Sequence, residues 1–249
     1  MKATAIKTHK ITINDNLLDV VDKYVNNLQE NSILAITSKI VSLTNQAVIK
    51  RQKGVKKVDL VHDHSELYLD PNQNKYNAAI TIVNGKLIGS AGIDSTNTDG
   101  YFVLWPPNLQ EITNQIRDFL RNKFKLKNFG VIITDSTSMP LQMGVIGIGI
   151  AYSGFRAFVF KTERDVFNKS KIIIRQNVLG GLSASAVLVM GEGNNQTPLC
   201  LLSELDFVNF IDNDPTNQEL SNLKVKLEND LFHNVWEKVD WKKGKLYKD

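Results

Sequence analysis

Apolar side chains recur at two spacings along the chain, and these spacings predict where helices and strands form. After Asn14, residues 17–28 repeat apolar side chains every three or four positions, which predicts an amphipathic helix capped by that asparagine. The same period predicts a helix around residues 109–120, and the run of alanine, leucine and valine at residues 178–190 predicts a buried helix. Short alternating or continuous apolar runs predict strands at residues 2–7, 32–37, 129–134, 144–151, 171–175 and 198–202.

Turn residues and polar stretches complete this outline. The Asn-Gly pair at 84–85 separates two apolar runs, residues 78–83 and 86–90. It predicts a β-hairpin, because both central residues of a type I′ turn need a positive φ. Residues 50–77 are polar without a sustained period, which predicts an irregular excursion or a mobile loop. From about Asn217 the sequence predicts a charged helix followed by a solvated, lysine-bearing tail.

The mixture of helices, strands and hairpins predicts an α+β fold with mixed and antiparallel sheets, flanking helices and two lobes. It does not favour a doubly wound nucleotide-binding fold, because hairpins interrupt the alternation of strand and helix. No repeat or low-complexity tract divides the chain. We therefore expect one domain over residues 1–249, with a core at about 1–203 and a C-terminal helix and tail at 204–249.

Composition limits the class of protein. A chain of 249 residues, 42% of them hydrophobic, is long enough for one large domain or two small lobes with real cores. The net charge of +4 allows a small anionic ligand but does not indicate a surface that coats nucleic acid. The single cysteine, Cys200, lies in an apolar run and is expected in the core, without a disulfide. No signal peptide or stretch of roughly 18 apolar residues is visible, so we expect a cytoplasmic protein without a membrane partner.

Three acidic residues follow apolar elements and are candidates for chemistry. Asp94 comes after a predicted strand, Asp135 after the apolar run 131–134, and Glu192 after the apolar helix, each beside glycine or a hydroxyl residue. Carboxylates at such positions suit hard divalent ions such as magnesium or manganese. The alternative is that each acid caps a helix or forms a turn, and the local pattern leaves that alternative open.

Other motifs give weaker signals. No Walker A loop is present, and the Gly-x-Gly at residues 147–149 is best explained by tight packing of a strand. The pair His62 and His64 could bind a metal, but a polar loop is the simpler interpretation. Neither a serine-hydrolase elbow nor a Cys/His arrangement is readable.

Four segments resemble, in order, the motifs of the coenzyme F-420 gamma-glutamyl ligase family. Residues 33–42 (ILAITSKIVS) resemble the family's VVTSKIVSK, and residues 90–97 (SAGIDSTN) resemble its NAGVDxSN. Residues 131–136 (VIITDS) are similar to VIISDT, and residues 190–192 (MGE) match MGE. The order and separations agree over about four-fifths of the chain, to about Leu202. Further segments look closest to a bacterial branch labelled as folate-metabolism gamma-glutamate ligases.

The resemblance implies a centre with two divalent ions, magnesium or manganese. Asp94 and Asp135 would be ligands of one ion, and Ser136 and Glu192 would hold the second. Lys39, Asp94 and Asp135 would be the catalytic residues, although Lys39 is also explained as an exposed surface lysine. The resemblance also allows potassium as a monovalent ion.

The resemblance further implies GTP as a co-substrate and an amide-forming reaction. The GTP γ-phosphate would be transferred to a carboxylate acceptor, an F-420-0-like deazaflavin or a folate-like compound, and the amine of L-glutamate would attack the resulting acyl phosphate. The partners would be these small molecules and a second copy of the chain, in an intertwined homodimer. The nucleotide site would be lined by Ser38, Lys39, Asn97, Gly191 and Gly193, with residues 7–10 near it.

The chain departs from the family pattern at three places. Where the archaeal form continues with FGRPWR after the second aspartate, residues 137–142 read TSMPLQ and contain no arginine. Leu43 replaces a later lysine, and residues 178–180 read VLG where the family has VAD. The predicted metal ligands are thus present, while acceptor recognition is altered. Two alternatives stay open: a non-catalytic protein that binds nucleotide and metal but has lost the acceptor site, and a different amide or phosphoryl transferase.

Overall fold

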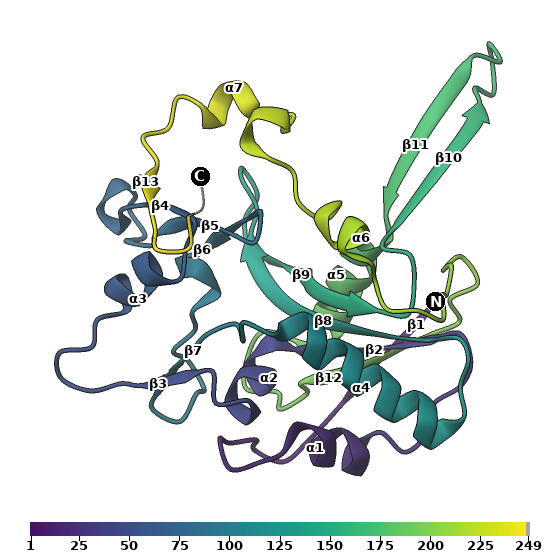
Figure 1. The fold of residues 1–249 in the computed structure, drawn as a ribbon, viewed down its shortest axis with the longest axis horizontal. Coiled ribbons are helices and arrows are strands. Elements are labelled where there is room, and N and C mark those ends of the chain that lie inside the picture. The colour runs from purple at the N-terminus through teal and green to yellow at the C-terminus, as the bar shows by residue number, and fades with distance from the viewer. Residues whose placement is uncertain (248–249) are drawn as a thin grey trace. The chain divides into compact units, whose positions relative to one another are not determined.

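The computed structural model describes residues 1–247, which form two compact units (Figure 1). Unit 1 comprises Met1–Asn45, Pro106–Ser136 and Val145–Asp214. Unit 2 comprises Gln46–Trp105, Thr137–Gly144 and the C-terminal residues from Pro215. Helices accompany mixed and antiparallel sheets, so the predicted α+β class is confirmed. No helix in residues 1–247 is long and apolar enough to cross a membrane.

A five-stranded sheet is the centre of unit 1. Its strand order is β1 (Lys2–Ile6), β12 (Leu199–Ser203), β2 (Ser32–Thr37), β8 (Phe129–Ser138) and β9 (Val145–Ser153). β2 and β8 run parallel, whereas β12 is antiparallel to both β1 and β2. All five strands were predicted from apolar runs, with shifts of a few residues at their ends.

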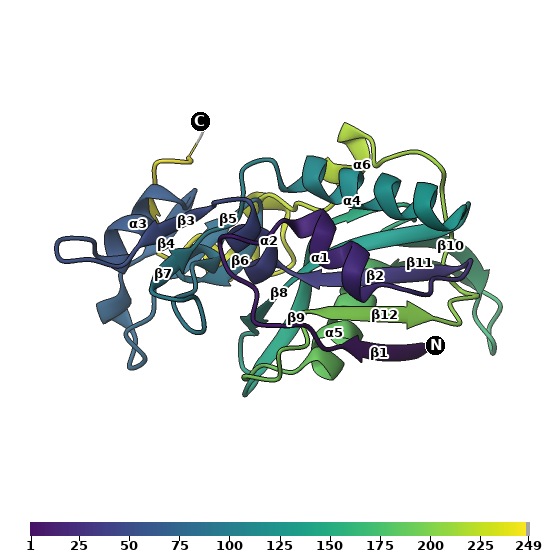
Figure 2. The same cartoon turned by 90° about the horizontal axis from the view of Figure 1, so that it is seen from below.

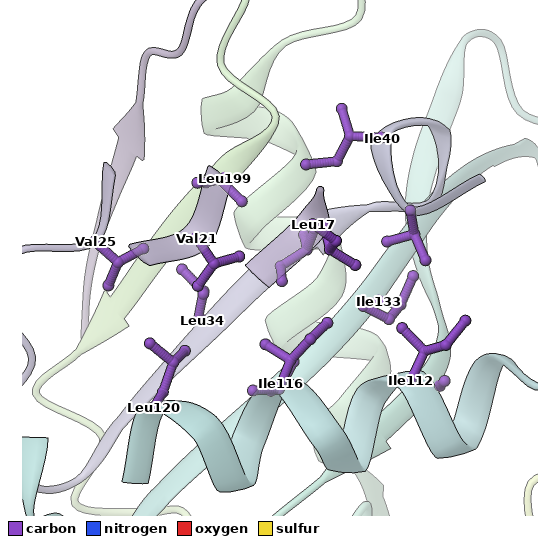
Figure 3. Close-up of a cluster of buried hydrophobic side chains, with 14 of the residues drawn as sticks. Leu17, Val21, Val25, Leu34, Ile40, Ile112, Ile116, Leu120, Ile133 and Leu199 are labelled. Carbon is purple, nitrogen blue, oxygen red and sulfur yellow. The ribbon is translucent and has the colours of Figure 1, made fainter. Parts of the chain in front are cut away.

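Helices pack on both faces of this sheet (Figure 2). α1 (Leu17–Tyr24) and α4 (Leu109–Phe124) direct side chains such as Val21 and Ile116 into one apolar cluster with Leu34 of β2 (Figure 3). Because strand side chains alternate, Ile33 of β2 is buried on the opposite side, where α5 (Val178–Met190) packs. α5 is apolar along most of its length, but Leu188 and Val189 near its end are exposed, so the predicted burial holds for only part of the helix.

The glycines of β9 allow α5 to approach closely. A Cβ atom on Gly147 would lie 2.5 Å from Val187 Cβ, and one on Gly149 would lie 2.6 Å from Leu179 Cδ1. The prediction that Gly147 and Gly149 serve tight strand packing is therefore confirmed.

A short helix and a hairpin adjoin the central sheet of unit 1. α2 (Ser38–Thr44) begins directly after β2. β10 (Phe158–Arg164) and β11 (Lys171–Asn177) pair only with each other and form a hairpin that extends beyond the sheet (Figure 1). The sequence predicted β11 but not β10. Cys200 is buried in β12, as expected.

Unit 2 is built around a four-stranded sheet with the order β13 (Lys242–Lys243), β4 (Leu67–Leu69), β5 (Ile80–Val83) and β6 (Lys86–Gly89). The β5–β6 hairpin confirms the Asn-Gly prediction, with φ of 51° at Asn84 and 67° at Gly85. A second, two-stranded sheet joins β3 (Val48–Lys50) to β7 (Tyr101–Val103). The 3₁₀ turn η2 (Ser90–Gly92) follows β6.

Three expectations were wrong: the cap of the first helix, the irregular character of residues 50–77 and the single helix near the C-terminus. Asn16, and not Asn14, caps α1, because its side chain accepts hydrogen bonds from the N–H groups of Leu18 and Asp19. Residues 50–77 contain α3 (Lys57–Asp63), β4 and the 3₁₀ turn η1 (Pro71–Gln73), which are too short to show a period.

The C-terminal segment also differs from the single charged helix that was predicted. It forms only the short turns α6 (Asn217–Ser221), η3 (Leu227–Asn229) and α7 (His233–Trp236). The tail then pairs as β13 with β4, where Lys242 also forms an ion pair with Asp70. Backbone pairing to a distant strand, which charge patterning does not report, makes this end part of unit 2.

Candidate functional site

Several predicted site residues of unit 1 lie at one edge of its sheet. β2 and β8 are parallel with Thr37 opposite Thr134, so Ser38, which follows β2, and Asp135, in the last part of β8, lie at the same edge. β12 begins at this edge because Leu199 lies opposite Ile36, and β1 ends there because Ile6 lies opposite Leu199. The carboxyl ends of neighbouring parallel strands are where α/β sheets usually bind ligands.

Asp135 is fixed at this edge by two hydrogen bonds. Ser38, the first residue of α2, donates from Oγ to Asp135 Oδ2 at 3.1 Å. The backbone N–H of Ser136 donates to Asp135 Oδ1 at 2.8 Å. Ser38 is only 7% exposed, whereas Asp135 is half-buried, so the carboxylate is held from the protein side and reaches the surface. The predicted nucleotide residue Ser38 is therefore also the partner of a predicted metal ligand.

Glu192 joins the same group through Ser136. Ser136 Oγ donates to Glu192 Oε2 at 3.2 Å, across 56 positions of sequence. Glu192 follows Gly191, which ends α5 with φ of +80° and donates its N–H to Val187 O at 2.9 Å. A side chain at Gly191 would lie 2.9 Å from Asn195 Oδ1, so glycine lets the chain leave the helix toward the sheet edge.

The loop at residues 191–198 is held against the strands by backbone hydrogen bonds. Thr8 donates its N–H to Gln196 O at 2.9 Å, and Thr37 donates its N–H to Pro198 O at 3.0 Å. Thr8, one of residues 7–10, therefore lies beside this loop. Gly193 is exposed in the same loop, and Lys39 is half-buried in the first turn of α2.

The Asp94 loop belongs to unit 2 and begins with three consecutive left-handed residues. Ser90, Ala91 and Gly92 have φ of 52°, 54° and 69°, and a Cβ on Gly92 would lie 2.6 Å from Trp105 Cε2. Each non-glycine residue in this conformation costs free energy and persists only where the surroundings enforce it. The chain therefore enters the Asp94 loop through a strained turn at residues 90–92.

Asp94 itself forms a turn. Its Oδ1 accepts hydrogen bonds from the Thr96 N–H at 2.9 Å and from Thr96 Oγ1 at 2.8 Å. Its backbone pairs with Val103 through two hydrogen bonds, of 3.2 and 2.9 Å. Asn97, the predicted nucleotide residue, is exposed in this loop with φ of 54°. The turn-forming interpretation of Asp94 is thus correct.

The sequence did not reveal two cations beside the Asp94 loop. Arg51 donates from Nη1 to Ser95 O at 3.2 Å. Lys57 lies half-buried at the start of α3; burial lowers the pKa of its ammonium group, and the nearby Asp94 carboxylate opposes this effect. Both residues lie in the stretch 50–77, whose pattern gave no sign of a site.

The donor atoms at the sheet edge suit a hard divalent ion. Ser38, Asp135, Ser136 and Glu192 offer only oxygen ligands. Within residues 1–247, however, no three His, Cys, Asp or Glu side chains are gathered closely enough to bind a metal by themselves. Two carboxylates joined through serines suit an ion that also takes ligands from the substrate. Magnesium usually completes its coordination shell with substrate oxygens in this way.

Comparison with known proteins identifies the family. A family model described as F420-0:Gamma-glutamyl ligase matches residues 5–204. The chain belongs to this family. The resemblance of the four motifs is thereby confirmed, as is the prediction of an amide-forming ligase. All the site residues described above lie within the matched range.

Curated relatives agree along most of their length. The chain is 27% identical to the coenzyme F420:L-glutamate ligase of Methanococcus maripaludis (strain C7) over 231 residues, which cover 87% of this chain and 90% of the relative. It is 26% identical to the enzyme of that name from Methanocaldococcus jannaschii, with 75% and 80% covered. The Methanosarcina mazei enzyme is 25% identical, with 83% and 88% covered.

Proposed function

We propose that this chain joins L-glutamate to a carboxylate acceptor, using GTP and divalent metal ions. The observation that carries the proposal is the group Ser38, Asp135, Ser136 and Glu192 at the carboxyl edge of β2 and β8. It places fixed hard-oxygen donors where an anionic substrate can reach them. The curated relatives are coenzyme F420:L-glutamate ligases, and their activity supports the same reaction class.

The proposed reaction has two steps. A carboxylate oxygen of the acceptor attacks the γ-phosphorus of GTP, the bond from that phosphorus to the bridging oxygen breaks, and GDP leaves. This gives an acyl phosphate. The α-amine of glutamate then attacks the acyl carbon, the carbon–oxygen bond to the phosphate breaks, and the amine loses a proton. The products are an amide and inorganic phosphate.

The side chains have separate tasks in this proposal. Asp135, Ser136 and Glu192 hold the ions, which supply positive charge against the anionic substrates. Asp94, on the strained loop of unit 2, stays a predicted ligand. Lys39, next to Ser38 at the start of α2, adds a point charge toward phosphate oxygens.

The acceptor is proposed only as a class, an F-420-0-like deazaflavin or a folate-like compound. Residues 137–142 contain no arginine, and Leu141 and Met143 are fully exposed. This observation favours a second candidate function, that of a protein that binds nucleotide and metal but does not catalyse ligation. Glutamate-dependent phosphate release distinguishes the two functions.

The test is release of inorganic phosphate from GTP or ATP, with manganese or magnesium, glutamate and each acceptor class. Asp135→Asn and Asp94→Asn should lower turnover by roughly a hundredfold or more, since each removes a charge worth several kcal/mol of transition-state stabilisation. Asp206→Asn is the matched control, because Asp206 is an exposed aspartate away from the site. Full metal-dependent turnover in Asp135→Asn would refute the proposed site. Tight GTP binding without any glutamate-dependent release would support the non-catalytic alternative.

We also propose that the chain forms a homodimer through the β10–β11 hairpin. The hairpin pairs with no other strand in the described residues, yet it exposes Phe160 by 64% and Phe167 by 93%. Exposed apolar side chains on a projecting element are typical of an interface. In sedimentation equilibrium, Phe160→Glu with Ile173→Glu should shift the protein to monomer, while Lys171→Glu should not. A wild-type monomer at all concentrations would disprove this assembly.

A further inference from the structure

Arg51 is held in one position beside the Asp94 loop. Its backbone N–H donates to Gly100 O at 2.9 Å, directly after β3. Its guanidinium lies over the ring of Phe102, with Cζ 5.6 Å from the ring centroid, and Nη1 donates to Ser95 O at 3.2 Å. Three contacts thus tie the residue to one short stretch of chain, residues 95–102, so most of the conformational entropy of a long side chain is already lost.

These contacts use only a small part of what the guanidinium offers. Arginine has five N–H donors in a planar fork, and only Nη1 is engaged, by one carbonyl. Within residues 1–247 no acidic side chain forms an ion pair with Arg51, and the side chain is exposed. A residue that only fixed the loop would not need to present the rest of the fork to solvent.

A second cation, Lys57, lies beside the same loop. Lys57 lies close enough to Asp94 for the two charges to interact, and α3, which carries Lys57, packs against η2. An anion that approaches the loop can therefore meet the positive charges of Arg51 and Lys57. Guanidinium groups bind carboxylates and phosphates with two parallel hydrogen bonds.

We propose that Arg51 binds an oxyanion of a substrate, either a carboxylate of glutamate or a phosphate of GTP. The identity of the oxyanion rests on the proposed function, whereas the geometry of Arg51 does not. Residues 137–142 of unit 2 contain no arginine, whereas Arg51 of the same unit presents an exposed guanidinium. The substrate is then held by a side chain that the family motifs do not include.

Binding is measured by separate calorimetric titrations with L-glutamate and with GTP plus manganese. Arg51→Gln should raise the dissociation constant of one of the two ligands at least tenfold, since charge-assisted paired hydrogen bonds are lost. Arg51→Lys keeps the charge without the planar fork and should also weaken that ligand. Lys53→Gln, an exposed charge two positions away in the same segment, should stay within about twofold.

Several results would overturn the proposal. They are unchanged affinity for both ligands in Arg51→Gln, equal losses in Lys53→Gln, or a wild-type protein that binds neither ligand. A lowered melting temperature in Arg51→Gln with unchanged affinities would show that the residue only fixes the loop. Wild-type turnover separates this proposal from the function: Arg51-dependent binding without any ligase activity removes the function and keeps the site. Ligase turnover together with ligand binding that does not depend on Arg51 keeps the function and removes the site.

Discussion

Replacing Arg117 by methionine should strongly destabilise unit 1. Arg117 lies on α4, is 1% exposed, and links three segments of the unit. Its Nε donates to Phe129 O at 3.0 Å, and its Nη2 donates to Ile211 O at 2.6 Å. Methionine fills much of the same volume but donates no hydrogen bond, so two carbonyl oxygens would lose their charged partner.

The expected size follows from these contacts. Hydrogen bonds from a charged donor contribute about 1.5–3 kcal/mol each, so the two together give roughly 3–6 kcal/mol. The ion pair between Arg117 and Asp214, at 3.6 Å, adds little, because the Asp214 side chain is 42% exposed and solvent screens it. We therefore expect Arg117→Met to lower the free energy of unfolding by about 3–5 kcal/mol. That corresponds to a melting temperature lower by roughly 6–20 °C for a chain of this size.

Thermal and urea unfolding followed by far-ultraviolet circular dichroism measure this loss. Asp214→Asn is the matched control: it removes the charge, keeps an acceptor for Ser153 Oγ at 2.9 Å, and should cost less than about 1 kcal/mol. A methionine variant within about 1 kcal/mol of wild type would refute the reasoning. So would a control variant that loses as much as Arg117→Met.

Three further predictions concern the loops and the core. Burial alone would raise the pKa of the Asp15 carboxyl, but hydrogen bonds from neighbouring groups lower it overall. The charged carboxylate therefore stabilises the fold above the ordinary pKa of about 4, and this stabilisation is lost as the pH falls through the lowered pKa of the folded protein. In urea titrations at acid pH, the difference in stability between wild type and Asp15→Asn should vanish. Burial raises the pKa of the Cys200 thiol to about 11, so Ellman's reagent at pH 8 should label it only after unfolding, and rapid labelling of the folded protein would contradict its burial. Gly92→Ala should lower the thermal midpoint of tryptophan fluorescence, because the new Cβ meets Trp105, while Gly89→Ala, with open space around it, should not; equal midpoints would refute this.

Local sequence determined the elements that are long or end in distinctive residues. The buried helix was expected at residues 178–190 and spans Val178–Met190, and the strand expected at residues 32–37 spans Ser32–Thr37. The Asn-Gly pair at 84–85 fixed the β5–β6 hairpin. In each case one short-range cause, a continuous apolar run or a required positive φ, is strong enough to act without its surroundings.

Elements that depend on a distant partner were not visible. β4 has three residues and β13 two, and each becomes a strand only through pairing; the two lie about 170 positions apart. The short turns of residues 215–247 were mistaken for one charged helix because their charges resemble a solvated helix face. Tertiary packing overrides weak local preference in such segments.

The candidate site divides in the same way. The sequence by itself determined that Asp135 and Glu192 follow apolar elements, and motif order linked them to one family. Only the tertiary structure decided that Ser38 pairs with Asp135 across 97 positions, because this contact needs the parallel register of β2 and β8. Arg51 shows the same limit: its contact with Ser95 joins residues 44 positions apart. The local sequence determines that a carboxylate lies near the end of a strand. Which side chains face that carboxylate depends on the strands and loops that the fold brings together.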